Sequence, residues 1–271
     1  MIKIKLLTVS VLFTVFTLNL QSQKKSDTEK KGDNKKEAAP KDVIKMNLSQ
    51  LIFTNLSFQY EYGFHKNMSG ALGVSVLIPR DIPSSFYVAP SSTQGFQLPK
   101  FGGWSVTPEF RFYPGEKVEH QSPHGFYIAP YFRYSKYSIK SDYNDVGPDP
   151  SSPYNNSYRM TASYYGFTGG LMIGSQWLIG KHFSIDWWIL GAGAGKARFS
   201  IEAISKDPNL NLSPAQQAEL RSDINSNVGG LGSFGAGNVS IETTSNSAKV
   251  TVSGLPMRSF RGFGFCLGFS F

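Results

Sequence analysis

The sequence predicts an all-β fold: a transmembrane, antiparallel, up-and-down β-barrel of eight strands, or of ten if a hairpin near the C-terminus joins it. Large apolar residues recur at every second position from residue 43 onward, which is the period of strands with one apolar face. That face is mostly aromatic, while the opposite face is rich in Gly, Ala, Ser and Thr. Side chains just fill an eight-stranded barrel, so the bulky face must point outward. Lipid tolerates such a surface, and a secreted soluble barrel is the competing architecture.

The N-terminus predicts export. Lys3 and Lys5 precede an apolar run over 6–18, which is too short to cross a bilayer as a helix, and small and polar residues follow, as in a signal peptide. We expect a signal peptide over 1–22, cleaved after Ser22. Residues 23–42 carry seven lysines and five acids with no apolar residue larger than Ala, which predicts a disordered periplasmic tether. The barrel is expected over 43–271.

Charge and cysteine content exclude several classes. The first 42 residues hold nine of the 27 basic and five of the 19 acidic residues, so residues 43–271 carry a formal net charge of only +4. This is too little for a nucleic-acid-binding surface. Cys266 is the only cysteine, so no internal disulfide can form.

The apolar alternation defines the expected strands in order. Leu56 to Phe64, Leu72 to Ile78, Trp104 to Phe112 and Phe126 to Tyr134 alternate most clearly. The predicted strands are 44–52, 55–64, 69–78, 104–113, 124–138, 162–179, 182–200 and 258–271. Their connections alternate in length, as short periplasmic turns and longer external loops require. The turns are 65–68, 114–123 and 180–181; the external connections are a tight one near Thr54 and loops 79–103, 139–161 and 201–257.

The last external loop has structure of its own. Ser213, Pro214 and Gln216 form a capping box with proline at the first helical position, which predicts a short helix over 214–224. The stretches 239–244 and 248–253 flank a turn and predict a hairpin. This hairpin either extends above the membrane or adds two strands to the barrel.

Several short motifs carry a family resemblance. The chain resembles a family of small outer-membrane β-barrels of unknown function from diderm bacteria, and more broadly the OmpA and OmpX type of eight-stranded barrel, in Lys45 to Leu48, Tyr60-Glu61, Pro108 to Tyr113, the glycine run 191–195 and Phe271. The resemblance implies fold and outer-membrane location, and no activity. The final alternation, with Leu267, Phe269 and Phe271, is similar to the signature that the barrel-assembly machinery reads.

Charged residues fall on inward positions of the predicted strands. They are Glu61, Glu109, Arg111, Arg133 and Asp186. Buried charges must be paired or hydrated, so these residues predict a polar cluster inside the barrel. One hypothesis is a static plug; the alternative is an ion pathway gated by carboxylate and guanidinium exchange.

The residues favour a protein without catalytic activity, with no cofactor and no metal. His65, His120, His124 and His182 all fall in or beside periplasmic turns, away from the outer rim where a lipid-modifying site would need its base. We therefore expect a structural or surface-interaction role through the external loops. The alternative is a narrow, porin-like channel for ions or small solutes, and the less favoured one is a lipid-modifying enzyme. The expected partners are outer-membrane lipid and lipopolysaccharide, the assembly machinery during insertion, and an extracellular partner at the loops.

The string GAGAGK at 191–196 imitates a nucleotide-binding loop. A Walker-type loop needs a glycine at Leu190 and Ser or Thr at Ala197, so no nucleotide is expected. The parity of the strand places Gly191, Gly193 and Gly195 on the outward face and Lys196 on the inward face.

Overall fold

A computed structural model describes residues 41–82, 99–115, 123–146, 155–180, 182–228 and 237–271. The predicted signal peptide and all but the last two residues of the predicted tether lie outside these ranges. The described elements are β1 (Asp42–Asn47), α2 (Leu48–Leu51), β2 (Asn55–His65), β3 (Met68–Asp81), β4 (Lys100–Phe112), β5 (Gly125–Val146), β6 (Asn155–Ile179), β7 (Phe183–Ser205), α3 (Pro214–Val228), β8 (Asn238–Thr243) and β9 (Ser247–Ser270).

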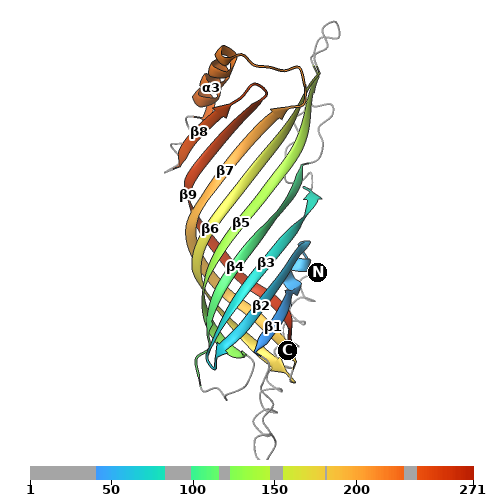
Figure 1. Cartoon of the computed structure of the whole chain (residues 1–271). Coiled ribbons are helices and arrows are strands. Elements are labelled where there is room, and N and C mark those ends of the chain that lie inside the picture. The colour runs from blue at the N-terminus through green and yellow to red at the C-terminus, as the bar shows by residue number, and fades with distance from the viewer. Residues whose placement is uncertain (1–40, 83–98, 116–122, 147–154, 181, 229–236) are drawn as a thin grey trace, which may run out of the picture. The chain divides into compact units, whose positions relative to one another are not determined.

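Eight antiparallel strands close into a ring, as the alternation predicts. The sheet order is β1-β2-β3-β4-β5-β6-β7-β9-β8, and β1 also pairs with β9. That closing seam runs from Val43 opposite Ser270 to Asn47 opposite Cys266. Strands β5, β6, β7 and β9 have 22 to 25 residues, against 6 in β1 and 11 in β2, so one side of the barrel wall rises far above the other (Figure 1).

The first strand is shorter than predicted. Instead of running over 44–52, β1 ends at Asn47 and a single helical turn, α2, follows. The Asn47 side chain accepts a hydrogen bond from the backbone of Gln50 at 3.0 Å, and this N-cap starts the turn. The connection to β2 is therefore longer than the tight one expected near Thr54: it spans residues 48–54 and ends with Thr54 in the left-handed region at φ 55°.

The predicted hairpin does not add two strands to the barrel. Its second strand is the upper part of β9, which continues without a break into the last barrel strand, and β8 pairs only with that part. The ring therefore has eight strands rather than ten. Strands also extend into all three predicted external loops: β3 and β4 pair into 79–103, β5 and β6 into 139–161, and β7 and β9 into 201–257.

The helix α3 begins at the predicted proline. The Ser213 backbone N–H donates to Gln216 Oε1 at 2.9 Å, and the Gln216 backbone N–H donates to Ser213 Oγ at 3.4 Å. These reciprocal bonds form the expected capping box, although α3 continues four residues further than predicted. Within the described residues, no helix is both long enough and apolar enough to cross a membrane.

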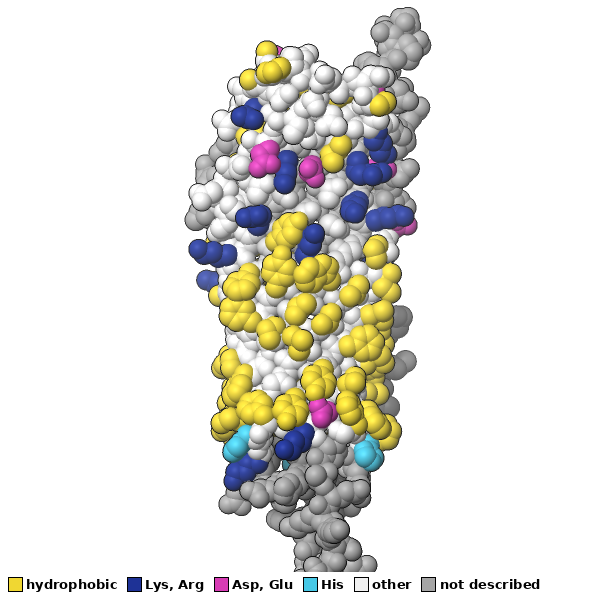
Figure 2. Space-filling view, in the orientation of Figure 1, with side chains coloured by type: hydrophobic (Ala, Val, Ile, Leu, Met, Phe, Trp, Pro, Cys, Tyr) yellow, Lys and Arg dark blue, Asp and Glu magenta, His cyan; other side chains and the backbone are white. Residues whose placement is uncertain are grey.

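The two faces of the lower wall differ as the size argument requires. Outward aromatic and aliphatic side chains remain exposed, and they form a belt around the lower half of the visible surface, with most Lys and Arg side chains above it (Figure 2). The inward side chains are small or polar, together with a packed cluster of Tyr113, Tyr127, Ala129, Tyr131, Met172, Trp188 and Cys266.

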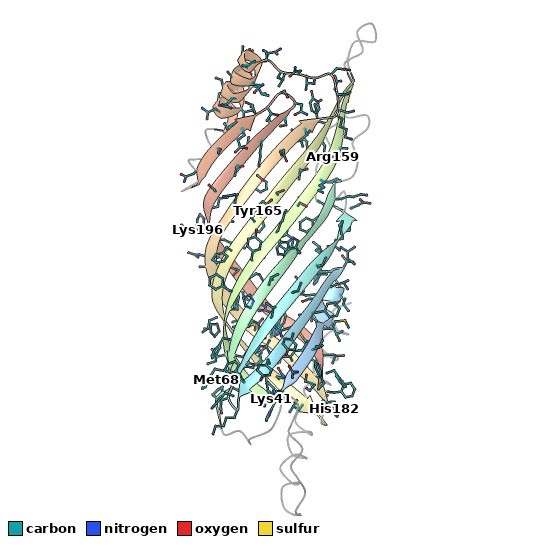
Figure 3. All side chains as sticks on the ribbon, viewed as in Figure 1. Lys41, Met68, Arg159, Tyr165, His182 and Lys196 are labelled. Atoms are coloured by element: carbon teal, nitrogen blue, oxygen red, sulfur yellow. The ribbon has the colours of Figure 1, made fainter. Side chains whose placement is uncertain are left out.

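The glycine run of β7 faces inward, which corrects the predicted register. Trp188 pairs with Gly174 and Leu190 with Ile173, so Ile189 is an extra residue that reverses the alternation of β7. Above this bulge Gly191 is buried, whereas Ala192, Ala194 and Lys196 are exposed. Lys196 accordingly points away from the barrel (Figure 3).

Candidate functional site

A cluster of six charged side chains lies inside the lower half of the barrel. Three are cations and three are carboxylates, and no member is more than 6% exposed. They come from five strands that face one another across the ring: Lys45 on β1, Glu61 on β2, Glu109 and Arg111 on β4, Asp186 on β7 and Arg261 on β9. Successive side chains of a strand point to opposite faces. Most of these charged residues stand between two outward apolar residues and therefore point inward, and Arg261 does so next to the irregularity at Phe263.

Lys45 joins two carboxylates from different strands. Its Nζ donates to Asp186 Oδ2 at 2.7 Å and to Gln176 Oε1 at 2.6 Å, and it forms an ion pair with Glu61. All three donor positions of the ammonium group are therefore used. This lysine ties β1 to β2, β6 and β7.

Arg111 is the centre of the cluster. Its Nη1 lies 2.7 Å from Asp186 Oδ2, and its Nη2 lies 2.8 Å from Glu109 Oε2. Nη2 also donates to Gln59 Oε1 at 2.8 Å. The other oxygen of Glu109 pairs with Arg261 on β9, so one continuous network connects opposite sides of the ring.

Aromatic side chains complete the cluster. Tyr113 donates from its hydroxyl to Glu61 Oε1 at 2.6 Å, and Tyr127 donates to Asp186 Oδ1 at 2.8 Å. The Arg111 guanidinium carbon stands 4.4 Å from the centroid of the Tyr127 ring. These hydroxyls satisfy carboxylate oxygens that burial has removed from water.

The cluster is neutral, with three positive and three negative groups. A buried charge without a partner costs several kcal/mol, so each group depends on the others. Within the described residues, no group of three or more His, Cys, Asp or Glu side chains could hold a metal ion. The arrangement can hold the strands together and obstruct the lumen.

The structure brings four of the five predicted interior residues together and leaves Arg133 apart. Arg133 lies on the inner face of β5, half-buried and higher in the barrel, and its Nε donates to Thr107 Oγ1 at 3.1 Å. Sequence reasoning missed Lys45 and Arg261. Lys45 alternates with Ile44 and Met46, which is a usable signal, but the irregularity at Phe263, with φ 55°, hides the parity of Arg261.

The predicted assembly signal lies where its sequence pattern places it. Leu267, Phe269 and Phe271 are on the outward face at the end of the barrel that holds the short turns, and they are 46%, 48% and 54% exposed. His65 and His182 lie at the same end. His120 falls outside the described residues.

Comparison with known proteins gives one match. A family model with the description "Protein of unknown function (DUF3575)" matches residues 12–205, which include β1 to β7. The comparisons with curated proteins and with solved structures find no match. Since the match covers more than two thirds of the chain, the protein belongs to the DUF3575 family.

Proposed function

We propose that this protein is a non-enzymatic outer-membrane β-barrel, closed to solutes, whose tall wall and external segments make contacts at the cell surface. The observation that carries the proposal is the apolar belt around a polar, charge-paired interior. Soluble proteins rarely expose so much contiguous apolar surface. Exposed members of the belt on seven strands include Phe58, Tyr60, Leu72, Val74, Phe110, Phe132, Leu171, Trp187, Leu190 and Leu267.

The height of the belt suits a bilayer. On β6 the outward apolar residues run from Ile179 to Phe167, which are twelve positions apart. At about 3.3 Å per residue and a strand tilt of about 40°, this span is about 30 Å tall. The belt therefore fits the hydrocarbon thickness that a lipid membrane presents.

The lengths of the connections favour one orientation. Outer-membrane barrels have short turns on the periplasmic side, and here the turns after His65 and Ile179 are short. The opposite end carries α3, β8 and the predicted external loops 79–103, 139–161 and 201–257. The surface contacts are assigned to that end, and lipopolysaccharide and membrane lipid to the belt.

The buried cluster favours a closed barrel over the alternative of a narrow channel. Arg111 and Glu109 are bonded on several sides and inaccessible to solvent, so an ion would have to break several charge-assisted bonds to pass. Refolded protein in a planar bilayer should give no conductance steps. Regular steps that disappear in the Arg111→Gln variant would contradict a closed lumen.

Cysteine labelling of whole cells tests the membrane location and the orientation. Lys140 is exposed on the outer face of β5, and Met68 begins β3 at the turn end (Figure 3). With a membrane-impermeant maleimide, Lys140→Cys should react on intact cells, whereas Met68→Cys should react only after the outer membrane is permeabilised. Native Cys266 is 1% exposed, so it should contribute little background. Labelling of Met68→Cys alone on intact cells would reverse the orientation, and recovery of the protein in the soluble fraction would defeat the proposal.

A further inference from the structure

The barrel wall reverses its polarity above the belt. In the lower half, apolar side chains point outward and polar ones inward. In the upper half, β5, β6, β7, β8 and β9 turn apolar side chains inward and polar ones outward. Gly166 opposite Ser135 is an inward pair, and from it the alternation continues upward on β5, β6 and β7. On β9 it resumes above Gly254, which is an extra residue at this level.

The inward row above that pair is aromatic and aliphatic. Tyr164 on β6 lies opposite Tyr137 on one side and Phe199 on the other, and paired residues project from the same face of a sheet. The row continues through Val252 and Val239. The next inward row, two residues higher, contains Ile139, Ala162, Ile201, Val250 and Ile241.

The outward rows of the same strands are polar. Lys136, Tyr165 and Arg198 lie side by side in one of them, and the outer surface of this region shows few hydrophobic side chains (Figure 2). Tyr165 lies on the visible outer side of the wall in Figure 3. The upper wall thus resembles the wall of a soluble barrel, with an apolar interior.

The apolar inner face of the upper wall retains accessible surface. Phe199 is 37% exposed, Ile201 41% and Ile139 37%. Aromatic rings line its lower part, with the ring centroids of Phe101 and Tyr137 5.8 Å apart and those of Tyr137 and Tyr164 6.2 Å apart. These side chains expose apolar surface that a ligand would remove from water.

An unpaired cation lies at the base of this face. Arg133 is on the inner face of β5, four residues below Tyr137. Lys45, Arg111 and Arg261 each have a carboxylate partner, but Arg133 forms no salt bridge within the described residues and bonds only Thr107 through Nε. Within the described part of the chain its two terminal nitrogens have no hydrogen-bond partner, so they can hold a planar anionic group in the fork geometry that arginine favours.

We propose that the upper barrel binds an amphipathic anion, with its carboxylate or phosphate head at Arg133 and its apolar body along the inner face. This inference rests on the proposed surface role and names the ligand class for it. The neutral cluster below forms the floor, so the head cannot pass further into the barrel. A purely apolar ligand would leave Arg133 without a counter-charge. A small polar anion would leave the aromatic and aliphatic side chains of the inner face in contact with water.

Binding of radiolabelled dodecanoate to the barrel in lipid nanodiscs tests the proposal. Empty nanodiscs give the background of simple partitioning. The barrel should add saturable binding of about one dodecanoate per chain. Arg133→Gln should weaken that binding about ten-fold, since a charge-assisted contact contributes on this scale, and Phe199→Ser should weaken it as well. Dodecanol, which lacks the charge, should bind equally to the wild type and to Arg133→Gln.

Matched controls separate the inner face from general effects of charge and folding. Lys136 is three residues from Arg133 but points outward, so Lys136→Gln should bind like the wild type. Each variant is first shown to be folded by the shift in its gel migration on boiling. Binding no greater than that of empty nanodiscs, or an equal loss in Lys136→Gln, would overturn this inference and leave the membrane barrel intact. Failure of the wild type to insert would overturn both.

Discussion

At the scale of single residues, the inward glycines of β6 and β7 give space to tyrosine rings of β5. A side chain at Gly193 would place its first carbon 2.9 Å from the Tyr131 hydroxyl and 2.7 Å from the carbonyl oxygen of Gly169. At Gly174 the same carbon would lie 2.3 Å from the Tyr127 hydroxyl. Because Tyr127 also bonds Asp186, the glycines help to hold the charged cluster. The GAGAGK string is therefore a packing device.

Replacing Gly193 by valine tests this interpretation. The added atoms overlap backbone on one side and Tyr131 on the other, so we expect a loss of about 1–3 kcal/mol in the free energy of unfolding. Urea unfolding of the barrel in lipid vesicles, followed by tryptophan fluorescence, measures the loss. Ala194→Val is the control, because Ala194 is exposed on the other face and should change stability by less than about 0.5 kcal/mol. Equal effects of the two variants would refute the corrected register.

Arg111 is expected to contribute more to stability than any exposed arginine. Arg111→Met leaves Glu109 and Asp186 buried with fewer partners, and breaking a buried pair from one side costs about 3–5 kcal/mol. The same unfolding experiment measures this cost. Arg198 is exposed on the outer wall, so Arg198→Met should remain close to the wild type. A barrel that loses Arg111 without loss of stability would show that the network does not hold the strands.

At the scale of elements, one ion-pair group links the upper ends of the long strands. Asp142 on β5 accepts from Arg159 Nε on β6 at 3.1 Å, and Lys206, just after β7, lies 2.6 Å from its other oxygen. These hydrogen bonds, first from Arg159 and then from Lys206, lower the pKa of Asp142 below its usual value of 3.8. A lowered carboxylate pKa stabilises the folded form above the usual value and loses that effect as the pH falls through the folded value.

This group predicts a local dependence on pH. Between pH 7 and 5 the amides near Arg159 and Lys206 should keep constant protection from hydrogen exchange, once intrinsic rates are corrected. Below pH 4 the protection should fall as Asp142 becomes protonated. The Asp142→Asn variant should show reduced protection at every pH and no decline of its own. A pH-dependent decline that persists in Asp142→Asn would assign the effect to another group.

Strict alternation was enough to predict which elements exist, but not where the register changes. β2, β3 and β4 alternate without interruption over 56–64, 72–76 and 104–112, and their faces follow from the sequence. In β7 the bulge at Ile189 reverses the parity, and nothing in the run WWILG marks which residue is extra. β1 ends where the Asn47 side chain caps a helical turn, and this cap overrides the strand pattern that was predicted to run to residue 52. Bulges and caps are local choices of hydrogen bonding, which hydrophobic periodicity does not record.

At the scale of the whole molecule, the fold class was predictable because size and chemistry together decide which face of a barrel points outward. The interior residues followed in part: Glu61, Glu109 and Arg111 lie on strands with unbroken alternation, and Asp186 lies in the part of β7 that precedes the bulge. Arg261 was missed because the irregularity at Phe263 hides its parity, whereas the alternation of Lys45 with Ile44 and Met46 was a signal that was not used. The reversal of polarity above the belt was not predicted, since only its first inward row, Tyr137, Tyr164 and Phe199, lies within the predicted strands 124–138, 162–179 and 182–200.

Two neighbouring tryptophans allow a test of the proposal that the apolar belt lies in a membrane. Trp187 is 37% exposed in the belt, and Trp188, directly after it, is 4% exposed and covered by the Arg261 guanidinium at 3.9 Å. In vesicles of brominated phosphatidylcholine, a variant that keeps only Trp187 should be quenched strongly, and one that keeps only Trp188 should be quenched weakly. Equal quenching of the two would contradict the assignment of the belt to lipid.

The closing seam between β1 and β9 determines when the barrel can finish folding. It joins residues 43–47 to residues 266–270. β1 can therefore complete its pairing only after residues 266–270 have been synthesised. Until the seam closes, β1 and β9 each have an unpaired edge. Lys45 and Arg261 are then not enclosed within the barrel. Strand edges that stay unpaired until the seam closes are sites where the chain can pair with other chains or be cleaved by proteases.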